Sequence, residues 1–219
     1  MTGLAAPQYF AIHHKEQSYI AKPDAGRHRL QRSIPLMLVL KKLGFSGTAN
    51  EARKTIQSGS VLVNSKVVKA PKYPVGLNDI VELKGAGKSY TVGINQYAKA
   101  DLVETAKPDY DAMLFKVVGK YKAKANQTMI RLHDGRITKA PKEVNVNDSV
   151  LIDSKGSVKK VLPMKVGSNC LVIDGVHVSA SGKIKELKSG TMHTSASALV
   201  VPEKGDGFET TIQNIMVTA

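Results

Sequence analysis

Basic side chains crowd two parts of this chain, and their spacing sets the first chemical hypothesis. Residues 1–33 hold Arg27, Arg29 and Arg32 beside His28, and residues 110–165 hold a second group made of Lys116, Lys120, Lys122, Lys124, Arg131, Arg136, Lys139 and Lys142. Clustered lysines and arginines bind phosphate backbones by displacing condensed counterions, which requires no nucleophile and no cofactor. The residue types therefore indicate polyanion binding.

The overall charge supports that hypothesis and is uneven along the chain. The sequence of 219 residues has 32 Lys+Arg against 18 Asp+Glu, a formal net charge of +14. Residues 1–165 carry 28 basic and 13 acidic side chains, whereas residues 166–219 carry 4 and 5. A basic body with a near-neutral end favours nucleic acid as the partner of the first three quarters. A membrane surface is less favoured, because no basic amphipathic helix or lipidation signal is present.

Three motifs suggest other chemistry, and each has a simpler explanation. Residues 85–89 read Gly-Ala-Gly-Lys-Ser, but the phosphate-loop pattern needs a glycine where Glu82 stands and a helix where residues 90–92 read as a strand. His133 and Asp134 resemble an acid–base pair, yet Asp134-Gly135 is the sequence of a tight hairpin turn. A zinc site at His13, His14 and His28 is disfavoured, because cysteine ligands are absent and adjacent histidines share one ion poorly.

The elements that must position the basic groups begin with a compact unit over residues 34–83. An apolar run with a basic end, closed by Gly44, predicts a helix with Pro35 in its first turn. Thr48 and Glu51 form a capping box that opens a second helix, with Ala49, Ala52 and Ile56 inward and Gly59 closing it. A hairpin turning at Asn64-Ser65 and a strand over residues 79–83 follow.

The rest of the chain is predicted to be rich in β-strands. Short strand-like runs appear at residues 114–118, 129–132, 136–138 and 150–152, and further runs at 170–173, 175–182, 199–201 and 215–217. Residues 1–33 show neither the periodicity of a helix nor that of a strand. We therefore expect an extended arm that buries little of itself and lies on a partner. Its aromatic side chains Tyr9 and Phe10, together with Tyr73, are candidates for stacking on exposed bases.

The unit over residues 34–83 resembles the S4-type RNA-binding domain. The resemblance rests on the helix–Gly–helix order with Ala52-Arg53-Lys54, on the Gly-Ser-Val-Leu-Val-Asn run, and on Asn78-Asp79-Ile80-Val81. That family places RNA against the second helix and the loop before the last strand. Here those positions hold Arg53, Lys54, Lys66, Lys69, Lys72 and Tyr73.

Two further resemblances extend the assignment over nearly the whole chain. Residues 166–184 are similar to the KOW motif of SH3-like barrels, with Ser179 where that family usually has glycine. The whole arrangement resembles the archaeal and eukaryotic-type small-subunit ribosomal protein S4e family, through four ordered matches at residues 4–7, 33–36, 73–80 and 132–136. The chain departs from that family in a shortened basic start, which means fewer phosphate contacts there, and in Gln8-Tyr9-Phe10 after Ala-Ala-Pro. Its overall brevity and the loose KOW match suggest a compact, archaeal version.

The resemblance implies an α+β, mostly β fold. It has an extended N-terminal arm (1–33), an S4-type domain of two short helices plus hairpin and sheet with a following linker (34–100), a small barrel-like central β-domain (101–165) and a KOW-like SH3-type barrel (166–219). The implied RNA-binding residues are Arg27, Arg29, Arg32, Arg53, Lys54, Lys66, Lys69, Lys72, Tyr73, Lys120, Lys122, Lys124, Arg131 and Arg136.

The function that follows is that of a structural constituent of the small ribosomal subunit that binds and organises ribosomal RNA without catalysis. Its expected partners are small-subunit RNA and neighbouring subunit proteins; no membrane, cofactor, metal or obligate homo-oligomer is expected. Single Cys170 and the short apolar runs indicate a soluble cytoplasmic protein. Two rivals stay open: an S4-domain RNA-modifying enzyme and a non-ribosomal regulatory RNA-binding protein.

Overall fold

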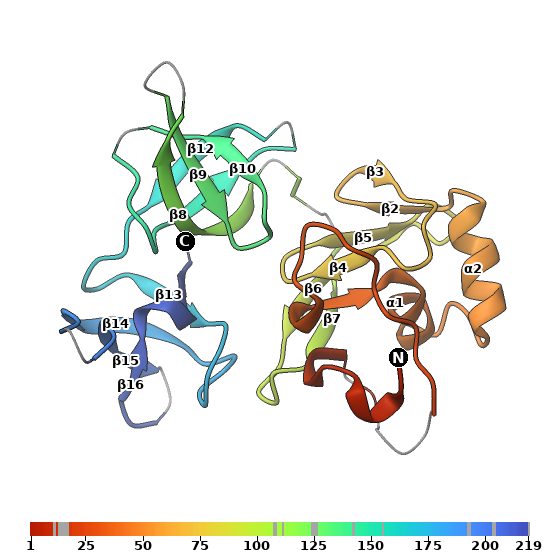
Figure 1. Ribbon diagram of the computed structural model, residues 1–219, viewed down its shortest axis with the longest axis horizontal. Helices are drawn as coiled ribbons and strands as arrows, with labels where there is room; N and C mark the ends of the chain where they lie inside the picture. Colours follow the sequence, from red (N-terminus) through yellow and green to blue (C-terminus); the bar gives the residue numbers. More distant parts are fainter. Residues whose placement is uncertain are drawn as a thin grey trace. The chain divides into compact units, whose positions relative to one another are not determined.

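The fold is taken from a computed structural model, which describes residues 1–10, 12, 18–106, 109–110, 112–123, 127–141, 143–154, 156–191, 194–202 and 205–218. The described chain forms two compact units (Figure 1). Unit 1 comprises Met1–Asn95 with Lys99–Tyr110, and unit 2 comprises Gln96–Ala98 with Asp111–Ala219. The finer division at residues 33, 100 and 165 stays a prediction.

Unit 1 packs two short helices on a five-stranded antiparallel sheet of order β3-β2-β5-β6-β7. The helices are α1 (Leu36–Lys42) and α2 (Ala49–Gln57), and the strands of this sheet are β2 (Val61–Val63), β3 (Lys66–Val67), β5 (Ile80–Leu83), β6 (Lys88–Ile94) and β7 (Ala100–Glu104). Leu36, Leu40, Ala52 and Ile56 are fully buried between these layers. The predicted S4-type arrangement of helices, hairpin and returning strand is therefore confirmed.

Local signals at the ends of α1 and α2 act largely as expected. Gly44 and Gly59 follow the two helices with φ of +74° and +79°, in the left-handed region that glycine adopts without strain. The Glu51 N–H donates to Thr48 Oγ1 (3.2 Å), and Glu51 Oε2 accepts from the Gly47 N–H (3.0 Å). Two details were wrong. Pro35 precedes α1 as its N-cap, and Ala49 is exposed because the first residue of α2 lies beyond the apolar stripe.

The N-terminal segment is folded into unit 1, so the expectation of an arm that buries little of itself was wrong. Its described residues form the single-turn 3-10 helices η1 (Gly3–Ala5), η2 (Gln8–Phe10) and η3 (Leu30–Arg32), and then β1 (Ser33–Pro35), which pairs antiparallel with β4 (Pro74–Gly76). Tyr9 and Phe10 are 4% and 2% exposed and belong to the hydrophobic core. Stacking of these two rings on bases is therefore excluded, because their faces are covered by protein. The sequence did not reveal this packing, since the partners of both rings lie far along the chain.

Unit 2 contains two five-stranded antiparallel sheets, of order β10-β9-β8-β11-β12 and β16-β15-β14-β13-β17 (Figure 1). Closure of either sheet into a barrel stays a prediction. The strands of the first sheet are β8 (Met113–Lys122), β9 (Thr128–Leu132), β10 (Ile137–Lys139), β11 (Ser149–Ile152) and β12 (Val158–Leu162). The strands of the second are β13 (Asn169–Val172), β14 (Ser181–Lys188), β15 (Ser197–Pro202), β16 (Phe208–Thr211) and β17 (Ile215–Val217).

Two differences from the expected strands in unit 2 have local causes. Strands β12 and β16 were not expected, because charged and threonine residues interrupt their apolar pattern. The run over residues 175–182 is mostly turn, and only its last two residues enter β14. Within that turn Ser179 has φ of +69°, the conformation for which the KOW family's usual glycine is suited.

A buried lysine fastens the end of the chain to the first sheet of unit 2. Lys116, on β8, is 3% exposed, and its Nζ donates to the carbonyl oxygens of Ile212 (2.8 Å), Gln213 (2.8 Å) and Ile215 (2.5 Å). These carbonyls belong to η5 (Ile212–Asn214) and β17. Three acceptors match the three donors of an ammonium group. Lys116 was expected on a charged surface. It is instead buried and holds η5 and β17 against the first sheet by hydrogen bonds.

Candidate nucleic-acid interface

The first basic group of the candidate interface lies on the outer side of α2. The helix buries Ala52 and Ile56, which are four residues apart, and this leaves Arg53 and Lys54 exposed on the other side. Neither cation forms an ion pair with a carboxylate among the residues that the structure describes. Side chains in this position can reach a phosphate without first breaking an internal contact.

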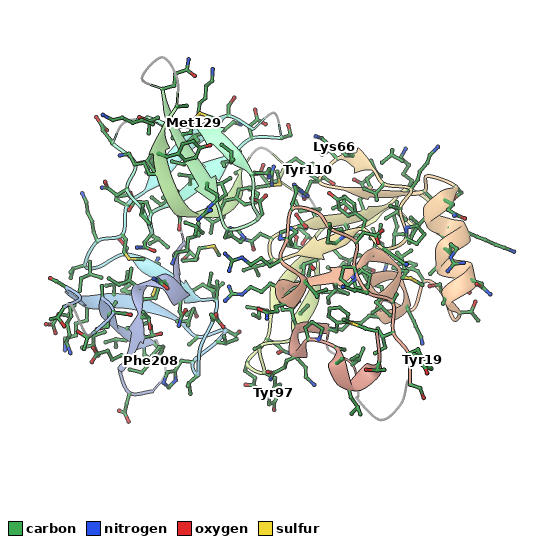
Figure 2. All side chains as sticks on the ribbon, in the orientation of Figure 1. Tyr19, Lys66, Tyr97, Tyr110, Met129 and Phe208 are labelled. Carbon is green, nitrogen blue, oxygen red and sulfur yellow. The ribbon has the colours of Figure 1, made fainter. Side chains whose placement is uncertain are left out.

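The β2–β3 hairpin presents Lys66 next to a tight turn. Asn64 and Ser65 have φ of +50° and +65°, as a two-residue hairpin turn that follows the strand twist requires. Lys66 begins β3, is exposed, and pairs in register with Val63. Figure 2 labels it at the edge of the sheet of unit 1, where the hairpin ends.

The loop between β3 and β4 carries Lys69, Lys72 and Tyr73 and is fixed by backbone hydrogen bonds on two sides. The first two N–H groups of α1 donate to it: Leu36 to the Tyr73 carbonyl and Met37 to the Pro71 carbonyl, both 2.9 Å. From the N-terminal segment, the Asp24 N–H donates to the Lys72 carbonyl (2.9 Å). The free N–H groups at the start of a helix need such acceptors. The loop is therefore held in one conformation while Lys69 and Lys72 stay exposed.

Lys69 connects this loop with α2. A Cβ placed on Gly59, just after α2, would lie 3.6 Å from Lys69 Cε, so the lysine stem runs along the end of the helix. The structure thus brings Lys69 beside the element that carries Arg53 and Lys54. Tyr73 is half-buried and packs against the core of unit 1, which leaves only part of its ring accessible.

A buried carboxylate joins Arg27 and His28 of the N-terminal segment to the rest of unit 1. Asp79 is 0% exposed; its Oδ2 lies 2.8 Å from His28 Nε2 and accepts from the Gly76 N–H (3.0 Å), while Oδ1 accepts from Asn64 Nδ2 (2.6 Å) and Arg27 Nη2 (3.5 Å). Asn64 Oδ1 in turn accepts from the Ile80 N–H (2.9 Å). One side chain therefore joins the hairpin turn, the β4–β5 loop and the N-terminal segment.

The electrostatics of this network favour the ionised carboxylate. Burial alone would raise the pKa of Asp79, but the hydrogen bond and charge of His28, the Arg27 guanidinium and the Gly76 N–H together lower that pKa from 3.8 to about 2. Arg27 is therefore partly engaged inside the protein, with 26% of its side chain exposed. Arg29 and Arg32 are exposed next to it.

Sequence reasoning missed Asp79 as a positioning residue. Its motif was noted only as part of a family resemblance, and three of its partners lie 15 to 52 residues away. A signal existed nearby: a carboxylate three residues after Gly76 can accept the glycine N–H, as a side-chain turn motif does. Gly76 also has no room for a side chain, because an added Cβ would lie 2.3 Å from His28 Nδ1.

In unit 2, the predicted basic residues fall into different environments. Lys120, Lys122 and Arg131 are exposed, and Lys124 lies outside the described residues. Arg136 is bound to Asp134 through Nε, and its guanidinium carbon lies 4.4 Å from the centre of the buried Phe115 ring. Phosphate contact by Arg136 stays a prediction, and its planar group already has an internal role.

The acid–base reading of His133 and Asp134 is replaced by a structural one. Gly135 has φ of +88° in the turn between β9 and β10, and the buried Asp134 accepts from the Arg136 N–H (2.9 Å). His133 Nδ1 accepts from the Lys116 N–H (3.2 Å). Both side chains therefore stabilise the predicted hairpin turn, which is confirmed.

The phosphate-loop-like sequence and the proposed zinc histidines also have simpler explanations in the structure. Residues 84–87 turn between β5 and β6, with Gly87 at φ of +61°, and strand β6 begins at Lys88, so no phosphate-binding helix follows. His13 and His14 lie outside the described residues, and His28 contacts Asp79. Among the residues with described positions, no cluster of His, Cys, Asp and Glu has the geometry to hold a metal.

Two further observations concern Cys170 and membranes. The Cys170 thiol is free and buried, and burial raises its pKa, so it is a poor nucleophile. No helix within the described part of the chain has the length and apolarity to cross a membrane.

Comparison with known proteins assigns these features to a family. Residues 34–81 match the S4 domain, and residues 86–157 match the ribosomal family S4e. The small ribosomal subunit protein eS4 of Methanocella arvoryzae is 31% identical over 98% of this chain and 91% of its own length, and that of Pyrobaculum aerophilum is 32% identical over 97% and 91%.

A solved structure supports the fold. The 30S ribosomal protein S4e of Thermoplasma acidophilum superposes with a TM-score of 0.70, covering 85% of this chain and 94% of that chain at 24% identity. The sequence relatives extend over nearly the full length of both chains, so the match is not confined to one shared module. The chain therefore belongs to the S4e family of ribosomal proteins, whose curated members are named small ribosomal subunit protein eS4.

Proposed function

We propose that this chain is a structural, non-catalytic constituent of the small ribosomal subunit that binds and organises small-subunit ribosomal RNA. The observation that carries the proposal is the fixed loop before β4. Lys69 and Lys72 are exposed on it, Lys69 at the end of α2, while its backbone is anchored to α1 and to the N-terminal segment. A rigid basic surface binds RNA with less loss of side-chain and loop freedom than a mobile one.

The contact surface proposed in unit 1 contains two kinds of residue. Exposed cations supply affinity through counterion release, and the half-buried Tyr73 supplies a flat edge beside them. Its members are Arg29, Arg32, Arg53, Lys54, Lys66, Lys69, Lys72 and Tyr73, with Arg27 contributing the part of its guanidinium that Asp79 leaves accessible. Lys120, Lys122 and Arg131 form the proposed contacts in unit 2.

The near-neutral C-terminal sheet suits a different neighbour. Residues 166–219 carry 4 basic and 5 acidic side chains, so phosphate attraction is weak there. We assign this sheet to contacts with neighbouring subunit proteins, and the whole chain to the ribosome in the cytoplasm.

Salt-dependent binding to small-subunit ribosomal RNA tests the proposal. The wild-type chain should lose affinity steeply as salt rises, and the double variant Lys69→Ala, Lys72→Ala should bind about tenfold more weakly with a shallower salt slope. The matched control removes two exposed lysines of β14, Lys183→Ala and Lys185→Ala, and so lowers the net charge equally. An equal loss in both variants would show that net charge alone binds RNA and that the loop has no special role.

A further inference from the structure

One face of the β8–β9–β10 ribbon is exposed and is not a simple basic surface. The strand register places Tyr121 opposite Met129, and Met129 opposite Lys139; it also places Gly119 opposite Arg131, and Arg131 opposite Ile137. Directly paired residues point to the same side of a sheet. The outer face is therefore made of Gly119, Tyr121, Met129, Arg131, Ile137 and Lys139.

Burial confirms which side faces solvent. Ile130 and Leu132, which alternate with the outer-face residues along β9, are 0% and 2% exposed and line the interior with Phe115. On the outer face Tyr121 is 44% exposed and Ile137 is 54% exposed, and Arg131 and Lys139 are exposed as well. An exposed aromatic ring and an exposed aliphatic side chain thus share this face with two cations.

The charge on this ribbon has one sign. The described residues of β8, β9 and β10 include no aspartate or glutamate. Lys120 and Lys122 pair with Ile130 and Thr128, so they lie on the opposite side of the ribbon. Figure 2 labels Met129 on this ribbon, with nitrogen-tipped side chains projecting around it.

Gly119 shapes the centre of the face. A Cβ at this position would lie 3.7 Å from both Nε and Nη2 of Arg131, so the guanidinium crosses the strand over the glycine. Arg131 is the diagonal neighbour of Tyr121 in this register. Diagonal neighbours on a sheet are about 7–8 Å apart, within reach of long and aromatic side chains.

We infer that the outer face binds unpaired nucleotides of RNA, with a base stacked on Tyr121 and flanking phosphates held by Arg131 and Lys139. The inference rests on the proposed function and specifies its ligand. A duplex presents phosphates but keeps its base faces stacked on one another. Its bases are therefore not available to stack on the exposed tyrosine or to pack against the isoleucine. A single strand presents both phosphates and base faces, and aromatic stacking is how proteins bind such bases. The lack of carboxylates on the ribbon disfavours a basic protein partner.

The test compares binding of a single-stranded RNA oligonucleotide with binding of the same strand in a duplex. Tyr121→Ala should weaken single-strand binding about tenfold or more and leave duplex binding nearly unchanged, since only the single strand offers a base face to stack on the ring. Tyr121→Phe keeps the ring and should bind like the wild type. The control is Tyr97→Ala, because Tyr97 is 63% exposed but lies outside this ribbon.

A fluorescent variant gives a second reading. The chain has no tryptophan, so Tyr121→Trp introduces one emitter on the outer face. Its emission should be quenched by the single strand and not by the duplex. Equal affinity of the Tyr121→Ala variant and the wild type for the single strand would overturn the inference, and so would an unquenched tryptophan in a complex that has formed.

The outcomes separate this inference from the proposed function. If the wild-type chain fails to bind small-subunit ribosomal RNA, the proposed function fails. If it binds with a steep salt dependence but prefers duplexes, or if Tyr121→Ala changes only incorporation into subunits and not RNA affinity, then the inference alone fails. In the last case the outer face would be a protein contact.

Discussion

Each unit contains a buried charged side chain that fastens a distant part of the chain, and the two do so by different means. In unit 1, Asp79 joins the N-terminal segment to the β4–β5 loop through His28 and Arg27. In unit 2, Lys116 joins η5 and β17 to the first sheet through three backbone carbonyls. A buried charge is costly unless opposite charge or dipoles surround it, and both solutions appear here.

The difference determines which unit responds to pH. The contacts of Asp79 depend on its ionised carboxylate, so acid weakens them. The carbonyl oxygens that accept from Lys116 Nζ do not titrate. The network that holds Arg27 and His28 is therefore sensitive to protons, whereas these hydrogen bonds of Lys116 are not expected to be.

The largest effect should come from removing the carboxylate of unit 1. Asp79→Ala leaves the donors of His28, Asn64 and Gly76 buried without their acceptor, so the free energy of unfolding should fall by about 3–5 kcal/mol. Hydrogen exchange of residues 27–35 and 74–83 should rise far more than that of residues 149–152. Asp79→Asn, which keeps one acceptor oxygen, should cost less. Comparable losses in both units would mean that Asp79 supports more than its own unit.

The corresponding change in unit 2 is Lys116→Met. It keeps the apolar stem and deprives the carbonyls of Ile212, Gln213 and Ile215 of their donor, which should cost about 2–3 kcal/mol. Faster exchange is expected at residues 212–217. The control is Lys120→Met on the same strand, where the exposed side chain should contribute about 0.5 kcal/mol or less. If Lys120→Met lowers the free energy of unfolding as much as Lys116→Met does, the loss comes from removing a charge and not from the missing hydrogen bonds.

Lowering the pH should weaken the structure of unit 1 more than that of unit 2. Since the pKa of Asp79 is lower in the folded chain than its usual 3.8, its contribution is complete at neutral pH and is lost as pH falls from about 4 toward 2. A shift of this size corresponds to about 2 kcal/mol. Exchange in residues 74–83 should increase over that range in the wild type and change less in Asp79→Asn. A flat response in the wild type would contradict an ionised Asp79.

The smallest effect is a stabilisation confined to unit 2. Ser179 has φ of +69°, so Ser179→Gly should remove backbone strain and raise stability by about 0.5–1 kcal/mol. Ser179→Ala keeps the Cβ and should give no gain. Thermal unfolding measures both, and the acid response of residues 74–83 should be the same in all three chains. If Ser179→Ala also raised the stability, the cause would be loss of the serine hydroxyl and not relief of backbone strain.

Features that depend on neighbours in sequence were predictable, and features that depend on distant partners were not. The capping residues Thr48 and Glu51 and the turns at Asn64-Ser65 and Asp134-Gly135 follow from side-chain and backbone chemistry within four residues. Asp79, Lys116 and the buried ring of Tyr9 have roles set by residues far along the chain. Charge alone placed Lys116 on the surface, because composition cannot show which lysine has internal acceptors.

The outer face illustrates the same limit for the candidate site. The sequence identified Lys120, Lys122 and Arg131 as one group, yet the register puts Arg131 on one side of the ribbon and the two lysines on the other. The bulge between Val117 and Gly119 changes which residues of β8 share a face. A pattern of alternation read along one strand cannot reveal such a shift.

The fastening by Lys116 also bears on the order in which the chain acquires its structure. Its acceptor at Ile215 lies 99 residues later, so this fastening cannot form until η5 and β17 have been synthesised. Contacts of such long separation slow folding, because the chain must close a large loop before it gains them. Unit 1 comprises Met1–Asn95 with Lys99–Tyr110, so it can fold before η5 and β17 have been synthesised.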